Sequence, residues 1–163
     1  RKGEGVVLAN LGYSYNEGGD KRKALEHYQT ALNIAIETND QIGQGIMLSN
    51  IGSLYQDWGE FQKAFDYYRQ SLDLRRQIKN VFGEAMVLQN IASLYRTLGD
   101  LETALNFINQ ALKIWQEKGF RREEALAFNS IGAIYSAIGD NKKALEFLQK
   151  ALEIQKSLDN TTG

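Results

Sequence analysis

The sequence has no cysteine, no proline and a single histidine among its 163 residues. Without cysteine there can be no disulfide and no thiolate chemistry. This fits an intracellular protein, and we expect a cytoplasmic location. The sequence also shows no glycine-rich phosphate loop and no metal-spaced cluster of ligand residues. We therefore expect no enzyme activity, no catalytic residues, no metal and no cofactor.

Neither sign of charge is in excess, because 19 basic and 20 acidic residues leave a net charge of −1. This balance gives no electrostatic basis for binding nucleic acid or an anionic membrane surface. No apolar run approaches the about 20 residues that a membrane span needs, and no signal-like stretch opens the chain. Because the sequence begins at Arg1 and ends at Gly163, we expect a segment of a longer protein.

What the sequence does contain is one pattern, repeated four times at a spacing of forty residues without insertion or deletion. Its second copy reads Asn50-Ile51-Gly52-Ser53-Leu54-Tyr55, then Gly59-Glu60, then Ala64. The four repeats cover about residues 1–40, 41–80, 81–120 and 121–160. A fixed period of this length predicts a solenoid, here a single domain over residues 1–163.

Each repeat divides into two halves with apolar residues at helical spacing, which predicts eight helices of about 16–18 residues. A glycine at the same place in every repeat should end the first helix, A, in a left-handed conformation. The acidic residue after it should cap the second helix, B. These pairs are Gly19-Asp20, Gly59-Glu60, Gly99-Asp100 and Gly139-Asp140.

Small residues in the middle of helix A predict a close approach of A and B within each repeat. They are Gly12, Gly52, Ala92 and Gly132. Glycine at such a place costs up to about 1 kcal/mol relative to alanine, which close packing can offset. His27 occupies a helix B position that carries Tyr67, Phe107 or Phe147 in the other repeats, so we interpret it as a packing residue.

The pattern Asn-Leu/Ile-Gly-x-x-Tyr, Gly-Asp/Glu, x-x-x-Ala-Leu/Phe and Ala/Ser-Leu-x-Leu/Ile resembles the tetratricopeptide repeat, over nearly the whole chain. Two features depart from it: the usual repeat has about 34 residues, and its usual proline is missing here. Both fit longer helices and resemble the 40-residue subtype of Pins-type adaptors, kinesin light chains and bacterial multi-repeat proteins. The resemblance implies an all-α, right-handed superhelix of four helix pairs. It also implies a protein or peptide partner in a concave groove lined by the A helices.

Four positions of helix A, spaced by four, three and four residues, should form ladders along this groove. The ladders are Val6, Ile46, Met86 and Leu126; Asn10, Asn50, Asn90 and Ser130; Tyr13, Ser53, Ser93 and Ala133; Glu17, Asp57, Thr97 and Ala137. Asparagine is unfavourable inside a helix, yet it occurs three times at one position. The resemblance implies that Asn10, Asn50 and Asn90 bind a peptide backbone. In the alternative, their amides bond to a neighbouring helix and hold the stack.

The remaining candidate groove residues are polar, and we expect specificity from Tyr13, Gln56, Gln89 and Arg96. Arg96 could receive a carboxylate of the ligand or pair with Asp57, and pairing is the commoner fate of such a charge. Ser130 interrupts the asparagine ladder. Asn129 lies one position away and points about 100° to the side. It either substitutes for the missing ladder asparagine or does not, and both alternatives stay open. The candidate peptide-binding residues are Asn10, Tyr13, Asn50, Ser53, Gln56, Gln89, Asn90, Arg96, Asn129 and Ser130.

Three further features lie near the ends of repeats. Arg75-Arg76 and Arg121-Arg122 are expected to be solvated. Trp115 and Phe120 either cover a gap between repeats or form a sticky surface spot. Terminal repeats normally need a polar cap, which the last repeat lacks, and its helix B is expected to present Phe147, Leu148 and Ile154. The sequence therefore predicts a scaffold that binds an extended peptide, or alternatively a structural or self-associating spacer beside an unseen effector domain.

Overall fold

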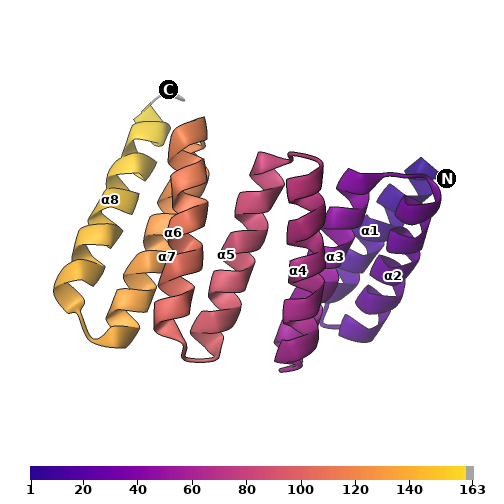
Figure 1. Cartoon of the computed structure of the whole chain (residues 1–163), viewed down its shortest axis with the longest axis horizontal. Coiled ribbons are helices and arrows are strands. Elements are labelled where there is room, and N and C mark those ends of the chain that lie inside the picture. Colours follow the sequence, from indigo (N-terminus) through magenta and orange to yellow (C-terminus); the bar gives the residue numbers. More distant parts are fainter. Residues whose placement is uncertain (161–163) are drawn as a thin grey trace. The chain divides into compact units, whose positions relative to one another are not determined.

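The computed structural model describes residues 1–160, and of Lys2 only the backbone. This part of the chain contains eight helices and no strand, which confirms the expected all-α class (Figure 1). The A helices are α1, α3, α5 and α7, and the B helices are α2, α4, α6 and α8. Their bounds are α1 Lys2–Glu17, α2 Lys21–Glu37, α3 Gln41–Asp57, α4 Phe61–Gln77, α5 Val81–Thr97, α6 Leu101–Lys118, α7 Arg121–Ile138 and α8 Asn141–Asn160.

The helices belong to two compact units, Arg1–Gly83 and Glu84–Gly163. In the first unit α1 packs on α2, α2 on α3, and α3 on α4. In the second unit α6 packs on α7 and α7 on α8. Tyr95 of α5 stacks on Phe107 of α6, with ring centroids 5.6 Å apart. Each B helix thus contacts the A helix of its own repeat, and α2 and α6 also contact the A helix that follows.

The turns between helices use one left-handed residue every twenty residues. Its φ lies between 52° and 89° at Gly19, Asn39, Gly59, Lys79, Gly99, Gly119 and Gly139. The four glycines expected to end the A helices are therefore confirmed in that conformation. Asn39 and Lys79 adopt it without glycine at the ends of α2 and α4.

Aspartates cap three of the four B helices as expected. The carboxylates of Asp20, Asp100 and Asp140 each accept a hydrogen bond from the backbone N–H three residues on, at 3.1–3.2 Å. These bonds stabilise the ionised form and hold the pKa of Asp20 and of Asp140 below its usual value. The expectation is wrong for Glu60, whose longer side chain makes no cap and pairs with Lys63 at 2.8 Å. Glutamate is not among the favoured N-cap residues, consistent with this difference.

Helices A and B of a repeat approach closely at the predicted small residues. A Cβ on Gly52 would lie 2.8 Å from the Tyr68 ring, and a Cβ on Gly132 would lie 2.9 Å from Leu148. Both distances are shorter than an ordinary carbon–carbon contact, so only glycine fits without a shift of its neighbours. The close approach expected from the sequence is confirmed.

Beside this contact, each repeat stacks an A-helix tyrosine on a B-helix ring. The pairs are Tyr15–His27, Tyr55–Tyr67, Tyr95–Phe107 and Tyr135–Phe147, with centroids 5.2–5.6 Å apart and planes within 15° of parallel. A lysine lies 5.0–5.2 Å from the tyrosine ring in three repeats, which adds a cation–π contact. His27 is thus a packing residue, as expected.

The close approach gives a stability prediction. Gly52→Ala should lower the free energy of unfolding by about 1–2 kcal/mol, because the strain against Tyr68 exceeds the gain in helix propensity. Gly3→Ala is the matched control, since a Cβ there would meet nothing within 4 Å. It should be neutral or slightly stabilising. Urea unfolding followed by circular dichroism measures both, and an equal effect of the two variants would contradict the packing argument.

Candidate functional site

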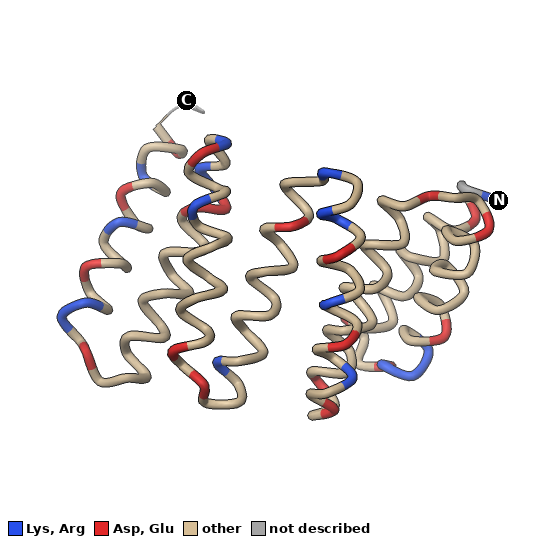
Figure 2. Tube along the Cα trace, in the orientation of Figure 1, with Lys and Arg blue, Asp and Glu red and all other residues tan. Residues whose placement is uncertain are grey.

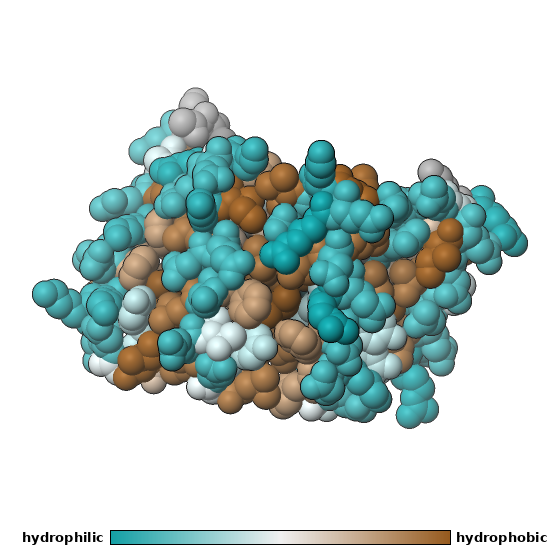
Figure 3. All heavy atoms as spheres, viewed as in Figure 1, coloured by the Kyte–Doolittle hydropathy of each residue, from teal (hydrophilic) through white to brown (hydrophobic). Residues whose placement is uncertain are grey.

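In each unit we call the A-helix face the surface formed by that unit's ladder positions, which lie on α1 and α3 in the first unit and on α5 and α7 in the second. Its first ladder is apolar and exposed to solvent. Exposed fractions are 61% for Val6, 41% for Ile46, 42% for Met86 and 48% for Leu126. One face of the molecule, drawn in Figure 3, shows apolar residues in brown among polar ones in teal. The A-helix face therefore offers side-chain contacts to an apolar ligand group.

The asparagine ladder lies beside it, with Asn10 exposed and Asn50 and Asn90 half-buried. Within residues 1–160, no side-chain hydrogen bond forms at any of these three amides. Their donors and acceptors are thus not used to hold neighbouring helices together. This differs from Ser49 and Ser71, whose hydroxyls bond to each other at 2.9 Å and to the Gly45 carbonyl.

In the second unit, four of the predicted residues line one cavity of about 230 Å³. They are Gln89, Asn90, Arg96 and Ser130, together with Ser93 and three apolar residues. The Ser130 hydroxyl donates to the Leu126 carbonyl of its own helix at 3.0 Å. Arg96 supplies a positive charge beside two amide groups, and such a set can bind a carboxylate or a peptide carbonyl. Asn129 is half-buried next to Ser130 and does not line this cavity.

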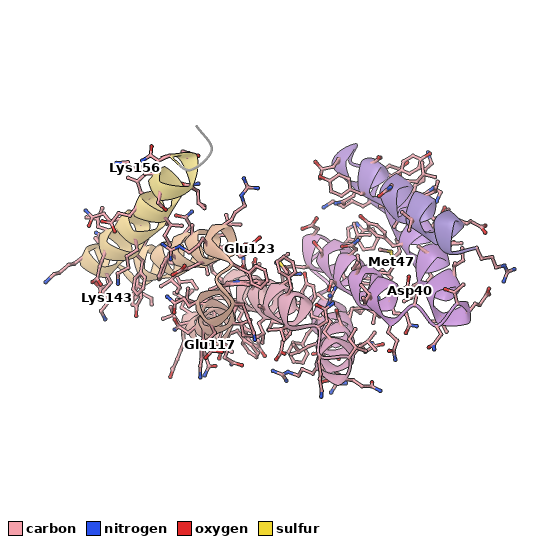
Figure 4. The ribbon with its side chains drawn as sticks, turned by 90° about the horizontal axis from the view of Figure 1, so that it is seen from above. Asp40, Met47, Glu117, Glu123, Lys143 and Lys156 are labelled. Carbon is pink, nitrogen blue, oxygen red and sulfur yellow. The ribbon has the colours of Figure 1, made fainter. Side chains whose placement is uncertain are left out.

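In the first unit, the A-helix face borders a second cavity of about 240 Å³. The exposed residues Val6, Asn10 and Ile46 line it together with the buried residues Ala31, Ile34 and Ala35 of α2. The N-cap residue of α3, Asp40, and Met47 within α3 also line the cavity, and both are labelled in Figure 4. This cavity is lined mainly by apolar side chains, in contrast to the cavity of the second unit.

Two other predicted residues lie near a buried tyrosine. The Tyr68 hydroxyl donates to Gln56 Oε1 at 3.0 Å and also hydrogen-bonds Ser53. Burial raises the pKa of Tyr68 to about 12. Tyr13, by contrast, is 60% exposed on α1. Gln56 therefore contributes to packing as well as to the surface on which specificity was expected.

Sequence reasoning was wrong about Arg75, which is 7% exposed rather than solvated. Its Nε donates to Ser71 Oγ at 3.3 Å, and its side chain lies against Gly45 and Gly83, where no side chain competes for the space. Burial lowers its pKa, because the protein interior disfavours the charged form. The signal that could have revealed this is the pair of glycines on the two A helices beside it, Gly45 of α3 and Gly83 of α5.

Trp115 and Phe120 cover a gap between repeats rather than form a surface spot. The Trp115 side chain is completely buried and meets Phe120 edge-on, with centroids 5.7 Å apart. Of the two neighbouring arginines Arg121 and Arg122, Arg121 pairs with the buried carboxylate of Glu124 at 2.5 Å.

The outer side of α8 also differs from the expectation. Ile154 is 5% exposed and Phe147 is half-buried on Tyr135, so only Leu148 of the three expected residues is exposed. Leu145 and Leu152 complete the exposed stripe at 60% and 49%. We call Leu145, Leu148 and Leu152 the α8 end face.

Charges of both signs are distributed along the described helices (Figure 2). In the first unit Lys21 pairs with Asp57 at 3.2 Å. No group of three or more His, Cys, Asp or Glu side chains that could hold a metal ion occurs in residues 1–160. None of the helices described is long and apolar enough to cross a membrane.

Burial of Tyr68 predicts a pH dependence of stability. A free tyrosine has a pKa of about 10, so between about pH 10 and pH 12 the unfolded chain loses this proton while the folded chain keeps it. The free energy of unfolding should fall by about 2–3 kcal/mol over this range. Urea unfolding at several pH values should show a smaller fall for Tyr68→Phe. Equal slopes in the wild type and Tyr68→Phe would contradict the assignment.

A sequence model of the tetratricopeptide repeat family matches residues 4–77 and 83–157. The chain therefore belongs to the tetratricopeptide repeat family. No curated protein matches the sequence.

Several solved structures have a similar fold. BtubC (BKLC) from P. vanneervenii is 24% identical, with a TM-score of 0.81 over 95% of this chain and 64% of that chain. Aspartyl phosphate phosphatase F from Bacillus subtilis is 16% identical, with a TM-score of 0.90 over 98% of this chain and 42% of that one. The Rap conjugation gene regulator of plasmid pLS20, in complex with the Phr* peptide, is 15% identical, with a TM-score of 0.86 over 98% and 44%. At these identities the likeness shows the fold, a solenoid of helix pairs, and this chain spans less than two thirds of each protein.

Proposed function

We propose that this chain is a protein-interaction scaffold that binds an extended peptide, or an extended segment of a partner protein, along the A-helix face. The observation that carries the proposal is the unused hydrogen-bonding capacity of Asn10, Asn50 and Asn90. An amide side chain offers a donor and an acceptor, as a peptide bond does. Asn10 and Asn50 recur forty residues apart within the first unit, so they can bind successive parts of an extended main chain.

The two ligand-facing regions of the A-helix face differ in chemistry. Arg96 in the second unit provides a positive charge, so an acidic side chain or a carboxylate of the partner fits there. The exposed apolar ladder provides contacts of the kind made by aliphatic or aromatic side chains. The partner we propose is therefore an extended segment that carries both apolar and acidic residues.

Similar structures support this proposal without deciding it. The pLS20 regulator holds a peptide, which shows that a related fold can do so. One similar protein is a phosphatase, but this chain spans 42% of it and shares 16% identity. We propose binding without catalysis for this chain.

Replacement of the ladder amides tests the proposed function. A phage-displayed library of random extended peptides is selected on the wild-type chain, and the affinities of the selected peptides are measured by calorimetry. Asn50→Ala combined with Asn90→Ala should weaken binding roughly ten- to a hundredfold, since each lost hydrogen bond is worth about 1 kcal/mol. Helical content and melting temperature should change little, because these amides make no intramolecular bond.

The matched control is Asn33→Ala combined with Asn109→Ala, which removes two exposed amides from the B helices. This variant should bind the peptides like the wild type. Unfolding of the ladder variant would show that the asparagines are structural. Failure to select any peptide, or unchanged binding, would contradict the proposed function.

A second candidate function is self-association through the α8 end face. The matching residues of α6, Ile108 and Leu112, are at most 8% exposed because α7 packs over them, whereas Leu148 and Leu152 are uncovered. At the other end of the chain, Val7 and Leu11 of α1 are 57% and 41% exposed, although Met47 and Ile51 at the same positions of α3 are buried against α2. A second copy could therefore place its α1 on α8 as α7 lies on α6.

Such a contact joins two different surfaces, so it would build open chains of copies rather than closed dimers. Sedimentation of the wild type should then show mass that rises with concentration. Leu145→Glu combined with Leu152→Glu should abolish the rise. Leu98→Glu combined with Ile138→Glu changes residues of similar exposure that belong neither to the α8 end face nor to the exposed pair Val7 and Leu11, and it should leave the rise in mass unchanged. A strict monomer at high concentration would rule this function out.

A further inference from the structure

One position of helix B differs sharply between repeats, and in the first repeat the residue there lines the cavity of the first unit. The position carries Ala35 in α2, Arg75 in α4 and Trp115 in α6, each forty residues apart. Arg75 is 7% exposed and Trp115 is completely buried. In α4 and α6 a large side chain thus fills the space beside the helix, whereas Ala35 brings only a methyl group.

The space left by Ala35 is the cavity of about 240 Å³ in the first unit. An apolar cavity of about 150 Å³ is already large enough to bind benzene. The polar groups at its edge are largely engaged, because Asp40 accepts from the Gly43 N–H at 3.0 Å and the Thr38 hydroxyl donates to the Ile34 carbonyl at 2.8 Å. An apolar guest therefore meets few unpaired polar atoms inside.

The entrance of the cavity lies on the A-helix face. Val6 and Ile46 border it and belong to the exposed apolar ladder, and Asn10 borders it from the asparagine ladder. A peptide whose main chain follows the asparagines would pass this entrance. Its side chain could then enter the cavity while the Asn10 amide bonds to its backbone.

We propose that this cavity is an anchor pocket for one bulky apolar side chain, best an aromatic one, of the bound peptide. The guest takes the place beside α2 that Trp115 takes beside α6 from within the chain. This inference rests on the proposed function and adds the side-chain class that the first unit selects. The apolar residue of the partner would then bind in this cavity, and its acidic residue would bind near Arg96.

The experiment uses N-acetyltryptophanamide as the probe, with N-acetylglycinamide as the probe without a side chain. Both are titrated into the ¹⁵N-labelled chain, and the amide signals of Gly5 and Gly43, which line the cavity, are followed. The tryptophan probe should shift these signals with a dissociation constant in the millimolar range. The glycine probe should not shift them.

Ala35→Trp fills the cavity from inside and should remove the shifts, weakening the probe at least tenfold. Ala35→Met is a second filling variant with a more adaptable side chain, in case the indole is too large to be accommodated. Ile36→Trp is the matched control, because it places the same residue one position away on an exposed part of α2. It should bind the probe like the wild type. Absence of shifts in the wild type, or unchanged binding by a folded filling variant, would overturn the proposal.

Library-selected peptides separate this inference from the proposed function. If the cavity is the anchor, Ala35→Trp weakens those peptides at least tenfold and Ile36→Trp does not. If Asn50→Ala with Asn90→Ala weakens them while Ala35→Trp leaves them unchanged, the A-helix face binds peptides but the anchor pocket is refuted. If only Ala35→Trp weakens them, the pocket stands and the role of the asparagines is refuted.

Discussion

The closest contact between helices A and B sets the geometry on which the other features depend. At Gly12 and Gly52 an added Cβ would lie 2.6–2.8 Å from the ring of a tyrosine on helix B. This approach brings the stacked rings into register and turns the ladder positions of helix A away from the core. The A-helix face therefore follows from a packing constraint on its opposite side, and not from any preference of the ladder residues themselves.

Much of the fold follows from the repeat alone. A forty-residue period with a fixed glycine predicts eight helices, their ends and the close approach, and all are present. Apart from the missing cap at Glu60, the errors concern side chains whose surroundings come from another helix. Arg75 looks like a surface cation until Gly45 and Gly83 are known to leave room for it. Ile154 was expected at the surface and is buried, whereas Leu152, two residues away and thus about 200° around the helix, is exposed.

The candidate site was predictable to a similar depth. Repetition identified the asparagines and the exposed apolar ladder as candidates. A residue that recurs at one position with no packing role is a candidate for a binding role. It did not identify the cavity beside Ala35, because an alanine in a helix is unremarkable in sequence. Only the buried large side chains of Arg75 and Trp115 at the same position of the other repeats show that Ala35 leaves space unfilled. Under the proposed function, small differences between repeats determine ligand choice, while their similarities determine the fold.

The turns described above have a consequence for how the chain folds. The left-handed turn residues recur about every twenty residues, and each aspartate cap bonds only three residues along the chain. The interactions that begin and end the helices of a pair therefore lie within the pair itself. Chains with mainly local contacts fold fast, and in repeat proteins folding can begin at any pair and spread to its neighbours. The route from the unfolded chain is then set by which pair is locally the most stable, and a mutation in one repeat can redirect that route without altering the final structure.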